Sequence, residues 1–127
     1  MRILIADDNE LIRRSVAALL SAEPAWEICG EAPDGAEALR KARTLQPNII
    51  LLDISMPGVS GLEVARDLRR EHPEAKIVVM SQHDPRHMRE RVMDAGGDAC
   101  LDKGLLAIEL ITTIKKLTFS VRSESGD

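Results

Sequence analysis

Polar side chains that suit phosphoryl chemistry follow four short apolar runs of the sequence. They are Asp7 and Asp8 after the first of these runs, and Asp53, Ser81 and Lys103 after three later ones. Three carboxylates that lie close together repel one another, so at neutral pH they need a cation. Oxygen ligands favour a hard ion such as Mg²⁺, with Mn²⁺ as the alternative, and Mg²⁺ keeps water molecules that a phosphoryl oxygen can replace. The residues therefore predict a magnesium site suited to a phosphate group.

The other members of this set suit the transition state of phosphoryl transfer. Lys103 supplies a positive charge and Ser81 a hydroxyl donor, and both would stabilise the negative charge spread over a moving phosphoryl group. One carboxylate must then be the nucleophile that forms an acyl phosphate. Asp53 is the best candidate, because it directly follows the apolar run 49–52. The turn at 56–58 should end this strand and leave the Asp53 side chain exposed.

Short apolar runs alternate with longer amphipathic stretches five times along the chain. Three runs are almost continuously hydrophobic, which is typical of strands buried on both faces of a parallel sheet. The expected strands cover residues 3–6, 26–30, 48–52, 76–80 and 98–101. Helical spacing of apolar residues predicts helices over residues 11–20, 35–45, 61–70, 85–95 and 105–117, with Asn9 and Asp34 as N-caps of the first two.

This alternation predicts an α/β fold with helices on both faces of one open sheet. Right-handed crossovers place the C-terminal ends of all strands at one edge, where ligands bind near the point at which the strand order reverses. The five polar groups should therefore meet at that edge.

The length and composition fit one globular domain. The chain has 127 residues, of which 44% are hydrophobic, and its net charge of -4 gives no overall attraction to nucleic acid or to an anionic membrane. The apolar run at residues 1–6 is too short for a signal peptide or a membrane span. Cys29 and Cys100 lie in apolar runs and are expected to be buried free thiols, with a disulfide or redox role as the alternative. Reduced thiols fit a cytoplasmic protein.

The sequence resembles the receiver domain of bacterial two-component response regulators from Arg2 to about Leu117. The likeness rests on the acidic pair 7–8, the segment 53–58 followed by Gly61, Ser81 and Lys103, all present in this order. Segments 26–32 and 34–38 are most similar to the NarL/FixJ-type subgroup. The resemblance implies a flavodoxin-like (CheY-like) doubly wound sheet of five parallel strands in the order 2-1-3-4-5.

The resemblance also implies roles in metal binding and phosphorylation. Asp53 would accept a phosphoryl group from a sensor histidine kinase. Asp8 and Asp53 would bind Mg²⁺ directly, with the main-chain carbonyl of Ser55 as a third protein ligand. Asp7 would act mainly through water.

A conformational switch is implied as well. Ser81 would bond to the phosphoryl group and move inward, while Lys103 would pair with it. The face formed by the fourth helix, the fifth strand and the fifth helix would then shift, and phosphorylation could produce a homodimer. Such a population shift requires the phosphate to favour one of two packings by a few kcal/mol.

Three positions depart from the pattern of the family. Cys100 stands where the family usually has an aromatic switch residue, and it is too small to act as a ring would. Gly104 replaces a proline that is preceded by a cis peptide bond. Because a cis bond before a non-proline residue costs about 3 kcal/mol, we expect a trans bond or a remodelled turn there. Gln82 stands where a small residue is common and could narrow access to the phosphoryl group.

Two further side chains could tune hydrolysis of the phosphate. Ser55 and His83 each lie two residues past a motif residue. The alternative is that both are solvated loop residues.

These observations lead to an expected organisation and function. Residues 1–119 would form the receiver domain, and residues 120–127 a polar tail that could start a linker. The output would be transcription through a LuxR-type helix-turn-helix domain outside this chain, which would provide the only contact with DNA, and no membrane partner is expected. The domain would promote its own phosphorylation and dephosphorylation without turning over an external substrate.

Other functions compete with this one. The chain could be a stand-alone receiver, or a binding module with the same fold that is not phosphorylated. A phosphatase of the aspartyl-phosphate type is disfavoured, because Ser55 stands where those enzymes carry a second aspartate as general acid.

Overall fold

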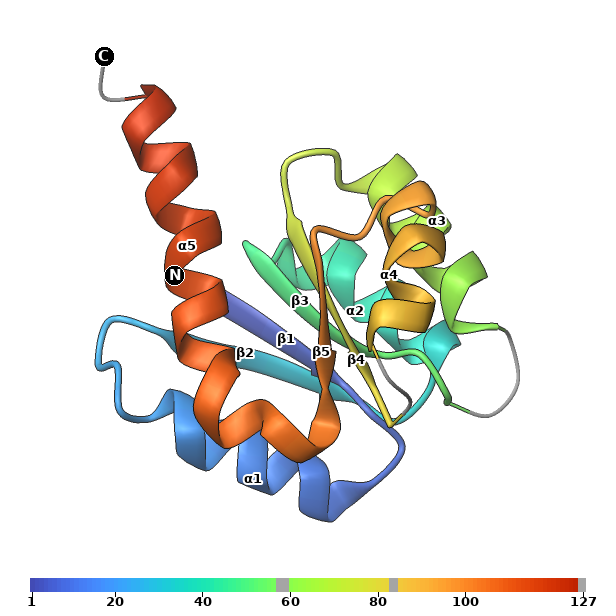
Figure 1. The fold of residues 1–127 in the computed structure, drawn as a ribbon, viewed down its shortest axis with the longest axis horizontal. Helices are drawn as coiled ribbons and strands as arrows, with labels where there is room; N and C mark the ends of the chain where they lie inside the picture. Colours follow the sequence, from blue (N-terminus) through green and yellow to red (C-terminus); the bar gives the residue numbers. More distant parts are fainter. Residues whose placement is uncertain (57–59, 83–84, 126–127) are drawn as a thin grey trace.

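The computed structural model describes residues 1–56, 60–82 and 85–125. They form a five-stranded parallel sheet with helices on both faces (Figure 1). The strand order is β2-β1-β3-β4-β5, which confirms the expected topology. The strands are β1 (Arg2–Ala6), β2 (Glu27–Ala32), β3 (Ile49–Asp53), β4 (Lys76–Ser81) and β5 (Ala99–Asp102). The helices are α1 (Glu10–Leu20), α2 (Gly35–Leu45), α3 (Gly61–Glu71), α4 (Pro85–Asp94) and α5 (Leu106–Ser125), and a short 3-10 helix η1 (Lys103–Leu105) precedes α5.

The sheet separates two hydrophobic layers. Helices α1 and α5 cover one face, and α2, α3 and α4 cover the other (Figure 1). Successive side chains of a strand point to opposite faces, so Ile3 and Ile5 pack in the first layer and Leu4 and Ala6 in the second. All four are fully buried. Burial on both faces explains why the central strands read as continuous apolar runs in the sequence.

Side-chain caps start the first two helices where the sequence predicted them. The Asn9 side chain accepts hydrogen bonds from the N–H groups of Leu11 and Ile12, and Asp34 accepts one from the N–H of Glu37. These bonds satisfy donors that have no partner within the helix. The cap at Asn9 also fixes the start of α1 directly after the acidic pair 7–8.

The fifth helix is longer than the sequence indicated. We expected it to end at Leu117, but it continues to Ser125, so that boundary was wrong. The physical reason is that neither proline nor glycine occurs between Leu106 and Ser125, and the first such residue is Gly126. Even so, none of the described helices, α5 included, is both long and apolar enough to cross a membrane.

The two cysteines are free, as expected, but they are half-buried and not buried, so that part of the expectation was wrong. Cys29 lies in β2 and Cys100 in β5, and these are the two edge strands of the sheet. An edge strand has a neighbour on one side only and is therefore less completely covered than a central one. Desolvation still raises the pKa of both thiols above the ordinary value.

A close approach of α3 supports the loop that follows β3. A Cβ atom at Gly61 would collide with the main-chain carbonyl of Ile54, so only glycine fits at the start of this helix. The N–H of Ile54 also donates to the carbonyl of Met80 at 3.1 Å. The chain directly after Asp53 is thus held by both α3 and β4.

Candidate functional site: a carboxylate cluster with a buried lysine

The strand ends bring the five predicted groups to one edge of the sheet. Asp7 and Asp8 follow β1, Asp53 and Ser81 end β3 and β4, and Lys103 opens η1 directly after β5. Carboxylate oxygens of the three aspartates lie within 4.8 Å of one another. The site therefore contains three acids and one lysine in direct proximity.

Two of the three carboxylates are buried. Asp7 is 0% and Asp53 1% exposed, whereas Asp8 is exposed. The expectation that Asp53 would be exposed was wrong, because β3 lies between β1 and β4 and Asp53 pairs with Met80 in the ladder. Buried carboxylates lose their hydration and need charged or hydrogen-bonding partners from the protein.

The main-chain N–H of Asp7 and both of its carboxylate oxygens contact other groups of the protein. Its N–H donates to the carbonyl of Ala32 at 2.9 Å, and its Oδ1 accepts from the N–H of Asn9 at 2.8 Å. Burial raises the pKa of the Asp7 carboxyl above its ordinary value, and the negative charge of Asp53 adds to the rise. The contacts with Lys103 and Asn9 lower this pKa but do not cancel the effect of burial.

Lys103 bridges the two buried carboxylates. Its Nζ lies 2.7 Å from Asp7 Oδ2 and 3.1 Å from Asp53 Oδ2, and its side chain is only 8% exposed. Burial opposes the charged ammonium, but the contacts with both carboxylates outweigh it and raise the pKa of Lys103. Lys103 is therefore a fixed positive charge at neutral pH.

Ser55 binds the other oxygen of Asp53. Asp53 Oδ1 accepts hydrogen bonds from the Ser55 N–H at 2.9 Å and from the Ser55 hydroxyl at 2.8 Å. The hydroxyl contact was missed by the sequence analysis, although short polar side chains two residues apart commonly bond in turns. The role of the Ser55 carbonyl as a metal ligand stays a prediction.

The chemistry of this cluster fits a divalent metal ion. Lys103 balances only one of three carboxylates. Asp7 Oδ2 and Asp53 Oδ2 are buried, and within the described part of the chain the contact recorded for each is the one with Lys103 Nζ. A donor set made of oxygen atoms suits a hard ion such as Mg²⁺.

The residues at the end of β4 differ in exposure. Ser81 is fully buried beside the cluster, one residue after Met80, which pairs with Asp53. Gln82 is exposed, and its proposed effect on access stays a prediction. His83 lies outside the described residues.

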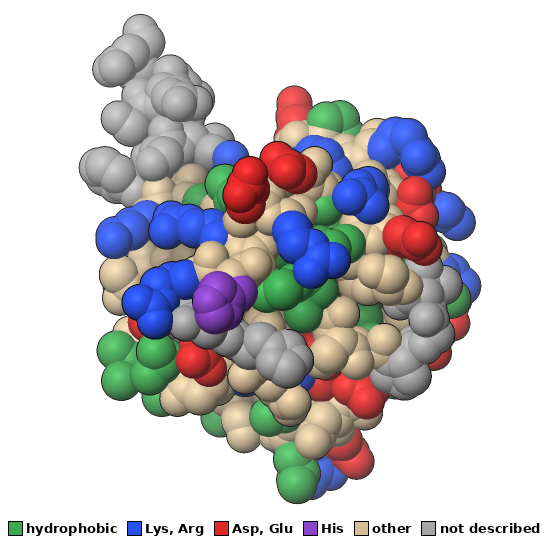
Figure 2. All heavy atoms as spheres, turned by 45° about the vertical axis from the view of Figure 1, so that its right-hand side comes forward, with side chains coloured by type: hydrophobic (Ala, Val, Ile, Leu, Met, Phe, Trp, Pro, Cys, Tyr) green, Lys and Arg blue, Asp and Glu red, His purple; other side chains and the backbone are tan. Residues whose placement is uncertain are grey.

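A groove runs over β5 next to Cys100. It has a volume of about 420 Å³ and is lined by Arg89 of α4, Cys100 of β5 and Lys116 of α5, among others. Figure 2 shows several Lys and Arg side chains on this side of the molecule, with acidic side chains between them. Cys100 thus lines the groove at the position where an aromatic ring was expected from the sequence pattern of the family.

The chain reaches Lys103 through a turn held by the side chain of Asp102, a contact that was not predicted from the sequence. The Lys103–Gly104 peptide bond is trans, as expected. Asp102 ends β5, and its Oδ1 accepts a hydrogen bond from the N–H of Gly104 at 2.8 Å, which caps η1. A proline at position 104 would have no N–H to donate. The signal that could have revealed this turn is an aspartate two residues before a glycine.

The sequence predicts phosphorylation of Asp53 next to Lys103, and Asp102→Ala is expected to slow this predicted reaction about fivefold, because loss of a cap of this kind costs about 1 kcal/mol and loosens the backbone that carries Lys103. Asp102→Asn keeps an oxygen acceptor and should retain most of the wild-type rate. Rates of phosphoryl incorporation from a small donor would measure both effects. Equal rates in the alanine and asparagine variants and in the wild type would contradict this role of the turn.

Comparison with known proteins gives a consistent assignment. The model of the response regulator receiver domain family matches residues 3–115. Response regulator GacA of Pseudomonas viridiflava is 34% identical over 115 residues, which cover 91% of this chain and 54% of GacA. Transcriptional regulatory protein DegU of Brevibacillus brevis is 36% identical, over 91% of this chain and 49% of DegU. The chain therefore spans about half the length of these curated relatives.

Solved structures show the same fold. The signal receiver domain of the response regulator NarL from Mycobacterium tuberculosis superposes with a TM-score of 0.83 at 29% identity, covering 91% of this chain and 94% of that one. A LuxR-family two-component response regulator from Aurantimonas gives a TM-score of 0.86 at 28% identity, covering 91% and 83%. With the matches to GacA and DegU, these similarities show that the chain belongs to the response regulator receiver domain family, in its NarL/FixJ-type subgroup.

Proposed function

We propose that this receiver domain accepts a phosphoryl group on Asp53 from a sensor histidine kinase, in a Mg²⁺-dependent reaction in the cytoplasm. The observation that supports this most strongly is the cluster itself: three carboxylates within 4.8 Å, with the Lys103 ammonium 3.1 Å from Asp53 Oδ2. Membership of the family supports a signalling switch rather than turnover of an external substrate.

The residues of the cluster would divide the work of binding the metal ion. Asp8, Asp53 and the main-chain carbonyl of Ser55 would be direct ligands, and Asp7 would act through water. Bound Mg²⁺ would neutralise charge on the phosphoryl oxygens and hold them in place. The exposure of Asp8 fits a ligand on the solvent side of the cluster.

Transfer then requires one bond to form and one to break. A carboxylate oxygen of Asp53 attacks the phosphorus of the kinase phosphohistidine, and an acyl phosphate forms as the phosphorus–nitrogen bond breaks. The electron pair of the broken bond stays on the imidazole nitrogen, and the ring leaves as neutral imidazole when its other nitrogen already carries a proton and otherwise takes one proton from solvent. Lys103 and Ser81 would stabilise the phosphoryl oxygens. Attack of water on the phosphorus would later return the Asp53 carboxylate and inorganic phosphate, so the domain would promote its own dephosphorylation.

Phosphorylation would be read out through a change in packing. Ser81 would move toward the phosphoryl group, and the α4-β5-α5 face would shift between two arrangements. Homodimerisation and a LuxR-type DNA-binding domain outside this chain would then control transcription. The relative named as a transcriptional regulatory protein and the solved structure named as a LuxR-family response regulator support this output.

Incubation with acetyl phosphate and Mg²⁺ should add one phosphoryl group to the wild-type chain, visible as a shift in intact mass. Removal of Mg²⁺ with a chelator should abolish the shift, and so should Asp53→Asn, because an amide is a far weaker nucleophile than a carboxylate. Asp67→Asn, on the outer side of α3, is the matched control and should be phosphorylated like the wild type.

Two results would contradict the proposal. One is the absence of any adduct on the wild type with several small phosphodonors. The other is an adduct that forms equally well on Asp53→Asn.

A further inference from the structure

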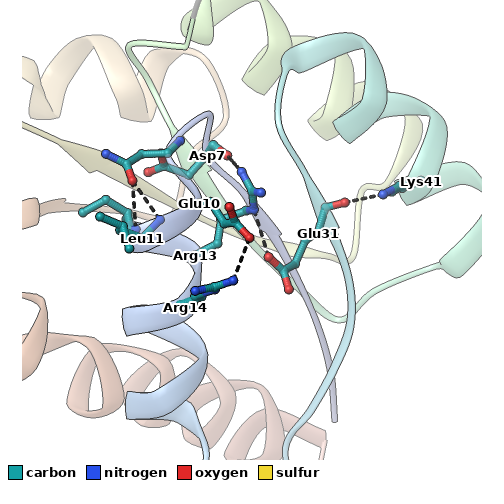
Figure 3. Close-up of polar contacts among 9 residues, drawn as sticks. Asp7, Glu10, Leu11, Arg13, Arg14, Glu31 and Lys41 are labelled. Carbon is teal, nitrogen blue, oxygen red and sulfur yellow. Dashed lines mark hydrogen bonds and ion pairs between the residues drawn. The ribbon is translucent and has the colours of Figure 1, made fainter.

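Arg13 joins the acidic loop after β1 to the neighbouring strand β2. Its Nη1 donates to the main-chain carbonyl oxygen of Asp7 at 2.7 Å, and its Nε donates to Glu31 Oε1 at 2.9 Å (Figure 3). The Arg13 side chain is only 16% exposed. The phosphoryl chemistry described above makes no use of this residue, so its burial calls for an explanation.

The contact with Asp7 fixes the peptide that carries two carboxylates. The carbonyl of Asp7 and the N–H of Asp8 belong to the same planar peptide unit, so a bond to one orients the other. The N–H of Asp7 is bound on its other side by Ala32 at 2.9 Å. Arg13 thereby helps to set the direction in which the exposed Asp8 side chain leaves the backbone.

The guanidinium group is itself held in place. Glu31 accepts the Nε–H of Arg13 through its side chain, and its main-chain carbonyl accepts a hydrogen bond from Lys41 Nζ of α2 (Figure 3). A planar guanidinium can serve two acceptors in a fixed geometry, whereas a lysine ammonium acts as a point charge on a flexible stem. Contacts from α1, β2 and α2 together therefore hold the acidic loop in place.

We infer that Arg13 is a positioning residue of the metal site, which fixes the Asp7–Asp8 peptide so that both side chains face one cation. This inference rests on the proposed Mg²⁺-dependent function. Arg13 holds the loop through the main chain and needs no contact with the ion, so the effect of its loss appears in metal affinity.

The charge of Arg13 and its positioning of the loop would have opposite effects on metal affinity, so an experiment can separate them. A cation near the site repels a metal ion, so if only the charge of Arg13 mattered, its removal would tighten metal binding. If Arg13 positions the loop, its removal weakens binding. Arg13→Lys keeps the charge but loses the two-acceptor fork, so it separates the two effects.

The test is metal binding by the full chain, with Mn²⁺ followed by electron paramagnetic resonance and Mg²⁺ by calorimetry. Arg13→Ala should raise the dissociation constant about tenfold, as expected for the loss of two charge-assisted hydrogen bonds. Arg13→Lys should raise it by a similar or slightly smaller factor. Arg14→Ala is the matched control, because Arg14 is the next residue on α1, is 71% exposed and pairs with Glu10 at 3.0 Å (Figure 3). Its dissociation constant should stay within about twofold of the wild-type value, as for an exposed ion pair.

A second readout reports the position of the loop without metal. Amide hydrogen exchange at Asp7 and Asn9, whose N–H groups are hydrogen-bonded, should be faster in both Arg13 variants and unchanged in Arg14→Ala. Exchange in the core strands provides the reference, so the comparison holds even if the Arg13 variants are less stable overall. Tighter Mn²⁺ binding by Arg13→Ala, or wild-type binding by Arg13→Lys, would overturn the inference. Absence of Mn²⁺ binding by the wild type would instead overturn the proposed function.

Discussion

Lys103→Ala is expected to lower the free energy of unfolding by about 3 kcal/mol at neutral pH in the absence of divalent cations, as found when one partner of a buried ion pair is removed. The variant would leave the carboxylates of Asp7 and Asp53, which are 0% and 1% exposed, without the cation that contacts both. Urea denaturation followed by circular dichroism would measure the loss. Added Mg²⁺ should recover part of it, because an ion bound only by the folded state stabilises that state.

A surface lysine provides the control for this prediction. Lys115 Nζ lies 2.7 Å from Glu23, but its side chain is 58% exposed. Lys115→Ala should therefore change the free energy of unfolding by no more than about 0.5 kcal/mol. Equal losses in the two variants would mean that Lys103 does not neutralise the carboxylate cluster. No recovery of Lys103→Ala with Mg²⁺ would instead contradict metal binding by the cluster.

Asp7→Asn is expected to have the opposite effect and to raise the free energy of unfolding by about 1 kcal/mol at neutral pH, within the range common for removal of a functional but destabilising group. Burial raises the pKa of Asp7, which means that the folded protein disfavours its charged form despite the contact with Lys103. Asparagine has a similar shape and carries no charge. The same change should weaken metal binding, so the variant would be more stable than the wild type but would have a lower metal affinity.

The gain from Asp7→Asn should depend on pH in a defined direction. At a pH below the pKa of Asp7 in the unfolded chain, the carboxyl group is neutral in both the folded and the unfolded state and hardly lowers the stability of the folded protein. As the pH rises from that value to the raised folded-state pKa, the unfolded chain loses its proton first, so the wild type loses stability, and the full loss is reached above the folded-state pKa.

Unfolding free energies of variant and wild type, measured from acid to neutral pH, should therefore diverge as the pH rises. Asp8→Asn is the control, because Asp8 is exposed and should give a smaller gain. If the stability gain of Asp7→Asn does not vary with pH, or if this variant is less stable than the wild type at neutral pH, the charge on Asp7 does not destabilise the fold.

The arrangement of the sheet could be predicted because it depends on simple patterns. Continuous apolar runs such as 49–52 occur where a strand is covered on both faces, and right-handed crossovers leave few possible topologies. The meeting of residues from β1, β3, β4 and β5 at one edge follows directly from that topology. The end of α5 was less predictable, because polar residues after Leu117 do not by themselves stop a helix.

The detailed contacts of the site could not be read from the sequence. The burial of Asp53 depends on how closely Lys103 and the neighbouring strands cover it. The bond from Arg13 to the main chain of Asp7 depends on the rotamer of one long side chain and on the position of Glu31 across the sheet. Such contacts arise from packing between elements and leave no periodic signal.

The central claim is that Asp53 carries the phosphoryl group, and the most direct measurement is to identify the modified residue chemically. The wild-type chain would be phosphorylated with acetyl phosphate and Mg²⁺ and treated with borohydride, which reduces an acyl phosphate to an alcohol. Peptide sequencing by mass spectrometry would then locate the change. We predict that homoserine appears at position 53 and at no other aspartate or glutamate. Homoserine at position 7 or 8 with position 53 unmodified, or a phosphate on a serine or histidine, would contradict the account.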